Sequence, residues 1–297
     1  MIHAHVILNP AAGGGAGRRL EDSVIRAFRT QGWSVELART EGPGHARELA
    51  ARAAEDGVRR IVAVGGDGTV HEVANGMLRQ RAAAQLGVVP VGTGNDFAKL
   101  VGVARHAPLR AVAQLAAARA RRFDVGRVGD EYFVNSMGLG FGPEVVRVRN
   151  AMPGLKGLWS YVVPLPRAFF GYRAPLCEIS SAEWRERGYV MMVEVCNGTT
   201  AGGAYRFAPG ADPADGYFDV CLVRRVSLLR FLGAVPRVMR GTHLGMKEIK
   251  LFRTREVVLH TPDAPLLLHL DGELRALEQR QCSVRVEPGR LNVLVAG

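Results

Sequence analysis

The sequence predicts a two-domain protein, in which an N-terminal α/β domain with a mainly parallel sheet precedes a C-terminal β-sandwich with inserted helices. The chain has 297 residues, twice the roughly 150 residues of an average domain. Short apolar runs alternate with helical patterns up to residue 123, and β-rich runs dominate beyond it. A hydrophobic fraction of 47% and a charged fraction of 23% exclude the disordered class.

In the first part of the chain, strands alternate with amphipathic helices, as in βαβ units. Apolar residues recur at helical spacing between Leu20 and Phe28, and Gly32 then ends that helix. The wholly apolar run 61–64 is typical of a strand buried on both faces of a parallel sheet. The predicted strands are 5–8, 35–37, 61–64 and 88–91, and the predicted helices are 20–28, 46–54, 70–78 and 108–118.

Beyond residue 123, alternating and β-branched patterns indicate antiparallel strands. Residues 124–128 and 132–135 flank Gly129-Asp130 and predict a β-hairpin. The further predicted strands are 189–196, 217–223, 255–260, 265–270, 282–286 and 291–295, and the predicted helices are 143–150, 155–170 and 227–240.

The charge balance indicates an anionic partner. There are 39 Lys and Arg against 28 Asp and Glu, a formal net charge of +11, which favours nucleic acid, acidic lipid head groups or phosphorylated substrates without choosing among them. The four cysteines contain no C-x-x-C pair, and Cys196 and Cys221, which lie in apolar runs, are expected to be reduced and buried. Neither a secretory signal nor an apolar run of about 18 residues is present, so we expect a cytoplasmic protein.

Three glycine-rich loops each follow a predicted strand: Asn9–Gly15, Gly65–Thr69 and Gly92–Asp96. Ligands of parallel sheets bind at the carboxyl ends of the strands, and glycine lets backbone N–H groups approach a phosphate closely. The loops are therefore expected to converge on one anion. They lack the Gly-Lys-Ser/Thr of a P-loop and the sixth-place glycine of the dinucleotide fingerprint.

Two runs, Gly65-Gly66-Asp67-Gly68-Thr69 and Gly92 to Ala98, resemble the catalytic domain of the diacylglycerol kinase family, particularly the soluble bacterial lipid kinases. Later motifs resemble that family in the same order. They are Asn197-Gly198, Asp215 to Val220 and Asp271-Gly272-Glu273. The resemblance covers nearly the whole chain, from Asn9 to Glu273.

The resemblance implies a fold like that of phosphofructokinase and NAD kinase. Residues 1–123 would bind the nucleotide, residues 124–287 would bind the lipid, and a tail from about 288 to 297 would pack back onto the first domain. ATP and substrate would meet in the interdomain cleft, and the γ-phosphoryl group would pass to the hydroxyl of diacylglycerol or a related lipid, a step of phospholipid biosynthesis.

The resemblance also implies roles for individual residues. Glu273 would be the general base and Asp271 its helper, although Asp271-Gly272 is equally a hairpin-turn signal. Asp67 would act in both catalysis and nucleotide binding. The nucleotide-binding residues would be Asn9, Thr40, Gly65, Gly66, Asp67, Gly68, Thr69, Thr93, Asn95 and Asp96.

One Mg²⁺ ion would arrive with ATP, and a second would be held by Asp215 with the carbonyls of Asp212 and Tyr217. An acidic β-turn is the alternative interpretation of that segment. Relatives carry a basic residue in the first loop, whereas this chain has Gly13-Gly14-Gly15 there, and Arg18 could replace it.

A lipid substrate requires transient contact with a membrane. Peripheral association with the inner face of an anionic membrane fits the net charge, and the aromatic-rich segment 152–172 is either an acyl-chain entrance or ordinary core packing. No nucleic-acid partner is expected, and a homodimer stays open. The alternative functions are an NAD kinase, against which Gly92 to Ala98 argues, and a nucleotide-binding regulatory protein with weak or no turnover.

Overall fold

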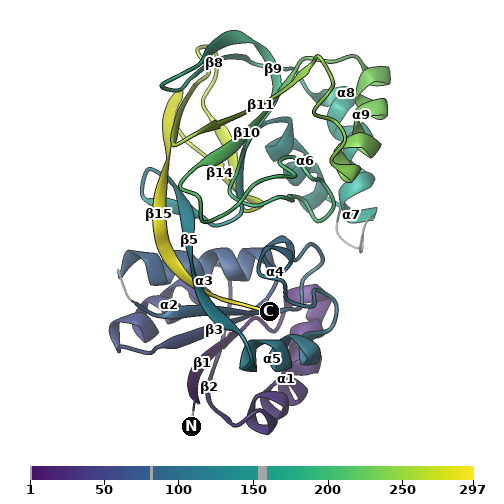
Figure 1. The fold of residues 1–297 in the computed structure, drawn as a ribbon. Coiled ribbons are helices and arrows are strands. Elements are labelled where there is room, and N and C mark those ends of the chain that lie inside the picture. The colour runs from purple at the N-terminus through teal and green to yellow at the C-terminus, as the bar shows by residue number, and fades with distance from the viewer. Residues whose placement is uncertain (1, 81–82, 153–158) are drawn as a thin grey trace. The chain divides into compact units, whose positions relative to one another are not determined.

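The computed structural model describes residues 2–80, 83–152 and 159–297, and the chain divides into two compact units (Figure 1). The first unit comprises residues 1–123 and 289–297, and the second comprises residues 124–288. Over the described residues, no helix combines the length and the apolar character needed to cross a membrane.

The first unit is built on a parallel sheet in the order β2-β1-β3-β4, with the end of β15 beyond β4. Its central strands are buried along most of their length, as the apolar run 61–64 predicts. The strands are β1 (Ile2–Leu8), β2 (Trp33–Arg39), β3 (Arg60–Gly65), β4 (Gln85–Pro90) and β15 (Gln281–Val295).

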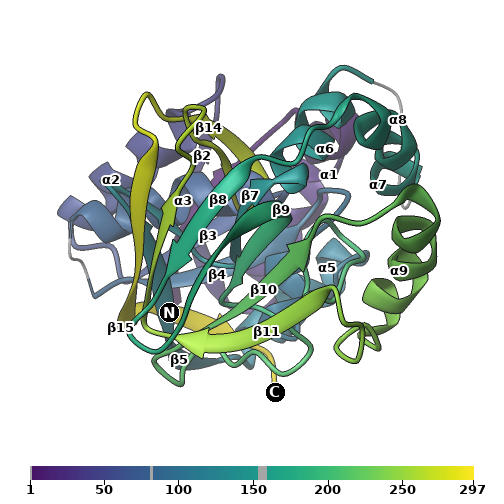
Figure 2. The same cartoon turned by 90° about the horizontal axis from the view of Figure 1, so that it is seen from above.

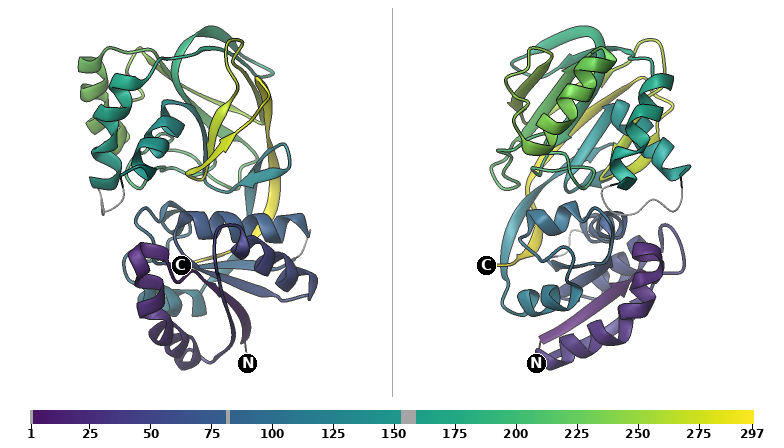
Figure 3. Two further views of the ribbon diagram at one scale, coloured as in Figure 1. Left: turned by 180° about the vertical axis from the view of Figure 1, so that it is seen from behind. Right: turned by 90° about the vertical axis from the view of Figure 1, so that its right-hand side faces the viewer.

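Helices cover both faces of this sheet (Figures 1 and 3). On one face α1 (Ala12–Thr30) contacts α5 (Pro108–Ala116), and on the other α2 (His45–Glu55) contacts α3 (Asp67–Arg79). A short helix, α4 (Asp96–Leu100), follows the third glycine loop. The sequence did not predict α4, because five residues are too few to establish a helical period.

The second unit is a β-sandwich whose two sheets share the long strand β9 (Arg185–Cys196). One sheet has the order β14-β13-β7-β9-β10-β11, and the other has the order β6-β5-β15-β12-β8-β9. The remaining strands are β5 (Arg119–Val128), β6 (Glu131–Phe133), β7 (Ser136–Gly140), β8 (Leu176–Ser180), β10 (Phe218–Arg224), β11 (Ile249–Thr254), β12 (Glu256–His260), β13 (Leu267–Leu270) and β14 (Glu273–Ala276).

Two apolar clusters lie on opposite faces of the β7–β9–β10 sheet. The sandwich core includes Phe133 and Phe218, whose rings stack 5.4 Å apart. The second cluster, which includes Phe141 and Phe231, packs the helices against the other face (Figure 2). The helices that contribute to this cluster are α6 (Phe141–Asn150), α8 (Pro164–Gly171) and α9 (Leu228–Arg240), and the short helix α7 (Trp159–Val162) precedes α8.

The predicted fold class is confirmed, but several predicted elements were wrong in detail. The strands expected at 282–286 and 291–295 are the single strand β15, which runs through Pro288 and through Gly289 at φ 59°. Up to residue 158, the helix expected at 155–170 lies outside the described residues. From residue 159 on it is two helices, α7 and α8, because Pro164 has no N–H with which to continue the first helix. Strands β7, β8, β11 and β14 were not predicted.

Candidate active site

The second and third glycine loops meet backbone to backbone at the carboxyl end of the first unit's sheet. A Cβ atom placed on Gly92 would lie 2.5 Å from the Cα of Gly66. Asn9, at the end of β1, donates from Nδ2 to Oγ1 of Thr69, at 3.1 Å. Because no side chain fits where the loops touch, the hydrogen-bond donors that the loops can offer an anion there are backbone N–H groups.

The first loop is a left-handed turn of three glycines. Gly13, Gly14 and Gly15 have φ values of 59°, 64° and 85°, which other residues adopt only with strain. A Cβ atom on Gly13 would lie 2.3 Å from the carbonyl oxygen of Val91, so this loop also touches the third. Arg19 reaches this loop, donating from Nη1 to the carbonyl of Gly14 at 3.4 Å, and the role of Arg18 stays a prediction.

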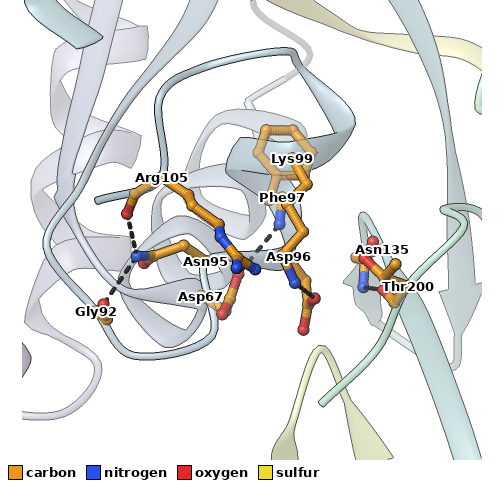
Figure 4. Close-up of polar contacts among 9 residues, drawn as sticks. All are labelled: Asp67, Gly92, Asn95, Asp96, Phe97, Lys99, Arg105, Asn135 and Thr200. Atoms are coloured by element: carbon orange, nitrogen blue, oxygen red, sulfur yellow. Dashed lines mark hydrogen bonds and ion pairs between the residues drawn. The ribbon is translucent and has the colours of Figure 1, made fainter. Parts of the chain in front are cut away.

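Asp67 and Asn95 hold the third loop in place (Figure 4). Oδ1 of Asp67 accepts the N–H of Phe97 at 3.2 Å. Asn95 has a left-handed φ of 50°, and its Nδ2 donates to the carbonyls of Gly92 and Arg105, both at 2.8 Å. The Asn95 amide group therefore shapes the loop from within.

Two cations lie at the third loop. Nζ of Lys99 forms an ion pair with Oδ1 of the buried Asp96 at 2.7 Å. The exposed side chain of Arg105 points toward Asp67 in Figure 4. The sequence pattern does not indicate a role for these two cations, because neither lies in the glycine motif itself.

The other predicted nucleotide residues also lie in the first unit. Thr40 follows β2, and its N–H donates to the carbonyl of Leu8 at 2.9 Å, one residue before Asn9. Thr93 is exposed. Glu72, whose role the sequence did not indicate, accepts the N–H groups of Gly44 at 2.8 Å and Ala46 at 3.1 Å, and so joins α3 to the start of α2.

In the second unit, Asp271-Gly272 forms the two-residue turn of the β13–β14 hairpin, with φ values of 52° and 88°. Both values are positive, as a type I′ turn requires. The Asp271 carboxylate accepts the N–H groups of Val134, Asn135 and Ser136 at 2.8–3.1 Å. It thereby ties the hairpin to the start of β7.

Glu273 is the first residue of β14 and pairs with Leu270 across the hairpin. Its side chain is exposed. Asn135, in the segment held by Asp271, donates from Nδ2 to the carbonyl of Thr200 at 2.8 Å (Figure 4). Asn197 donates to the carbonyls of Asp124 and Val134 at 2.8 and 2.9 Å. The Asn197-Gly198 motif therefore has a structural role beside the hairpin.

The surroundings of Asp215 do not fit a magnesium ion as they stand. One carboxylate oxygen accepts the N–H of Tyr217 at 3.0 Å, and the other accepts a hydrogen bond from the Arg253 guanidinium. The carboxylate of Asp212 accepts the N–H of Ala214 at 3.1 Å. Among the residues that the structure describes, no three His, Cys, Asp or Glu side chains cluster as metal ligands would.

An α/β unit with converging glycine loops, followed by a β-sandwich, defines a two-domain kinase fold. The family profile described as "Diacylglycerol kinase catalytic domain" matches residues 3–128, and that described as "YegS C-terminal NAD kinase beta sandwich-like domain" matches residues 135–295. The chain belongs to this family of diacylglycerol kinases and YegS-type lipid kinases, and it is a kinase.

Relatives match along most of their length. The chain is 30% identical to "Diacylglycerol kinase" of Bacillus subtilis, over 92% of this chain and 90% of that protein. It is 32% identical to "Probable lipid kinase YegS-like" of Pseudomonas savastanoi, over 89% and 85%. A crystal structure of a diacylglycerol kinase from Bacillus anthracis has a TM-score of 0.74 at 18% identity, covering 99% of this chain and 96% of that chain, and so shares the fold.

Proposed function

We propose that the protein is an ATP-dependent lipid kinase, which transfers the γ-phosphoryl group to the hydroxyl of diacylglycerol or a related lipid. The observation that carries the proposal is the contact among three glycine loops at the carboxyl end of one parallel sheet. Phosphoryl transfer asks a protein chiefly to hold phosphates and to place a hydroxyl, and backbone N–H groups at such loops hold phosphates well.

The triphosphate would lie on backbone N–H groups of Gly65, Gly66 and Gly68. Gly65 and Gly66 precede α3, and Gly68 lies in its first turn, which has no side-chain cap, so the partial positive charge of the helix N-terminus favours an anion there. Asn9 and Thr69 fix each other's side chains beside this turn. Thr40, Thr93, Asn95 and Asp96 complete the proposed nucleotide site.

Positive charge would come from side chains outside the first loop. Arg19, Lys99 and Arg105 are the candidates, since they lie at the first and third loops. Magnesium bound to ATP would neutralise the phosphate oxygens, and Asp67 supplies the oxygen ligand chemistry that this ion prefers. A second ion at Asp215 stays a prediction, because it would have to displace Arg253.

Glu273 is the proposed general base. Its carboxylate would take the proton of the lipid hydroxyl as that oxygen bonds to the γ-phosphorus and the bond from phosphorus to the β-γ bridging oxygen breaks, releasing ADP. Asp271 would act as a positioning residue, since its carboxylate holds the hairpin through three backbone N–H groups.

The lipid would enter beside the helices of the second unit. Four large apolar side chains on α7, α8 and α9 are exposed by 48–82%: Trp159, Phe170, Leu229 and Leu232. From Arg225 to Lys247 the sequence has five cations and no acidic residue, so this surface suits an anionic membrane. Of the segment 152–172, Leu155, Lys156 and Leu158 lie outside the described residues.

The proposal is tested by incubating the protein with radiolabelled ATP, magnesium, NAD and mixed micelles that contain diacylglycerol, phosphatidylglycerol, ceramide or a sphingoid base. Label in a lipid supports the proposal and identifies the lipid. Label in NAD instead would establish the NAD kinase alternative. Binding of ATP with no transfer to any acceptor would establish the regulatory alternative.

A further inference from the structure

A buried pair of ionisable side chains in the second unit has no part in the chemistry proposed above. Glu194 on β9 is 1% exposed and His269 on β13 is 6% exposed. Their closest atoms, Oε2 of Glu194 and Nε2 of His269, are 3.3 Å apart. The two strands are not neighbours, because β7 lies between them.

The register of three strands brings the pair together. His269 is opposite Gly138 of β7, and Gly138 is opposite Glu194. A Cβ atom on Gly138 would lie 2.3 Å from Nε2 of His269 and 2.6 Å from Oε2 of Glu194. Any other residue at 138 would therefore separate the pair, and glycine lets the two side chains meet above the middle strand.

The first turn of α6 closes over the pair. A Cβ atom on Gly142 would lie 3.2 Å from Nε2 of His269 and 3.7 Å from Oε2 of Glu194. The N-terminal end of α6, which carries partial positive charge, thus lies near the carboxylate. The pair therefore connects three strands and one helix.

The pair is poorly satisfied for a purely structural contact. Within the described part of the chain, neither oxygen of Glu194 nor Nδ1 of His269 has a hydrogen-bond partner. Buried polar groups without partners are few in folded proteins, because each unsatisfied group destabilises the folded state. Stability alone therefore does not account for Glu194 and His269.

His269 places the pair in the hairpin that carries the proposed base. On β13 it lies two residues before Asp271 of the turn, and it is opposite Leu274 of β14. Glu273 is adjacent to Leu274 and opposite Leu270. A restraint on the imidazole of His269 therefore acts on the hairpin from inside the sheet, while the bonds of Asp271 hold it from the turn.

We propose that Glu194 and His269 are positioning residues, which fix the β13–β14 hairpin so that Glu273 is held in one place during phosphoryl transfer. The inference rests on the proposed role of Glu273. It assigns neither side chain a contact with substrate.

The decisive variant removes both polar side chains at once. Glu194→Leu/His269→Leu leaves neither side chain buried without the other, so it should fold with near-normal stability. We expect kcat per ATP-binding site to fall at least tenfold with the KM for ATP unchanged within twofold. The amide hydrogens of residues 271–274 should exchange at least tenfold faster, while those of the first unit keep their rates.

Two further variants separate the restraint from the presence of the two side chains. Gly138→Ala keeps both side chains but pushes their ends apart, and we expect the same loss of kcat. His269→Gln keeps a donor that can reach Glu194, and we expect activity within threefold of the wild type. The matched control is Glu178→Leu/His260→Leu, which removes a half-exposed Glu–His pair at 3.0 Å on β8 and β12 and should change neither kcat nor the exchange rates.

A folded Glu194→Leu/His269→Leu protein with wild-type kcat and unchanged exchange at 271–274 would overturn the inference. If the wild type itself transfers no phosphate to lipid, the proposed function fails instead. The exchange measurement still decides whether the pair restrains the hairpin, because it requires no turnover.

Discussion

A Cβ atom on Gly92 would lie 2.5 Å from the Cα of Gly66, so the second and third glycine loops are in backbone contact. The contact leaves no space for a side chain at Gly92. The same closeness brings Asp67 within hydrogen-bonding distance of Phe97. The shape of the edge therefore depends on glycine at these two positions.

We expect Gly92→Ala to reduce the affinity for ATP at least tenfold, because the new methyl group pushes the two loops apart. Overpacking of this kind costs about 1–3 kcal/mol in the free energy of unfolding. Titration calorimetry and thermal denaturation measure the two effects. Gly42→Ala is the control, since no atom lies within 4 Å of a Cβ there. Equal affinities in the two variants would contradict the proposed nucleotide site.

Glu273→Gln should lower turnover by roughly 10²- to 10⁴-fold, the range expected when a general base is lost. ATP binding should not change, because the proposed nucleotide contacts all come from the first unit. Single-turnover transfer to a micellar lipid and equilibrium ATP binding measure the two properties. Glu278→Gln changes an exposed glutamate five residues away and should behave as the wild type. Normal turnover in Glu273→Gln would exclude Glu273 as the base.

The sequence predicted those features that depend on residues close together along the chain. Glycine loops after apolar strands predicted that the loops meet, since all parallel strands end at one edge. The prediction of two strands at 282–286 and 291–295 was wrong because a strand can pass through a glycine with positive φ. The partners of Asp271 lie more than 130 residues away, as the separations to residues 134–136 show. The meeting of Glu194 and His269 needs the register of three strands, which no local pattern carries.

Arg253→Gln should strengthen the binding of magnesium near Asp215. The guanidinium of Arg253 occupies one oxygen of that carboxylate, and a divalent ion needs the same oxygen. A rise in melting temperature on adding magnesium without ATP, larger in Arg253→Gln than in the wild type, measures the effect. Asp215→Asn in the Arg253→Gln background should abolish it. If Arg253→Gln gains no response to magnesium, the second metal site is excluded.

Native thiols should react slowly with alkylating reagents. Burial raises the pKa of Cys177, Cys221 and Cys282 to about 12 and that of Cys196 well above its usual value, and only the thiolate reacts. At pH 8 we expect all four to be protected until denaturant is added, as mass spectrometry of alkylated protein would show.

Because the unfolded thiols lose protons first, near pH 8.5, the free energy of unfolding should fall as the pH rises above that value. Rapid labelling of Cys177, Cys196 or Cys221 in the native protein at pH 8 would contradict the burial of these side chains.

Phe170→Ser/Leu229→Ser should weaken binding to anionic vesicles at least tenfold. Phe170 on α8 and Leu229 on α9 are exposed by 76% and 82%, and burying each side chain in a bilayer contributes about 1.5–3 kcal/mol. Binding of the wild type should also weaken as salt is added, because the nearby arginines act over a Debye length. Cosedimentation with phosphatidylglycerol vesicles measures both effects.

Leu109→Ser, which changes a 47% exposed leucine of the first unit, should bind as the wild type does. Equal loss of binding in Leu109→Ser and in the double variant would remove the membrane-contact role from α8 and α9.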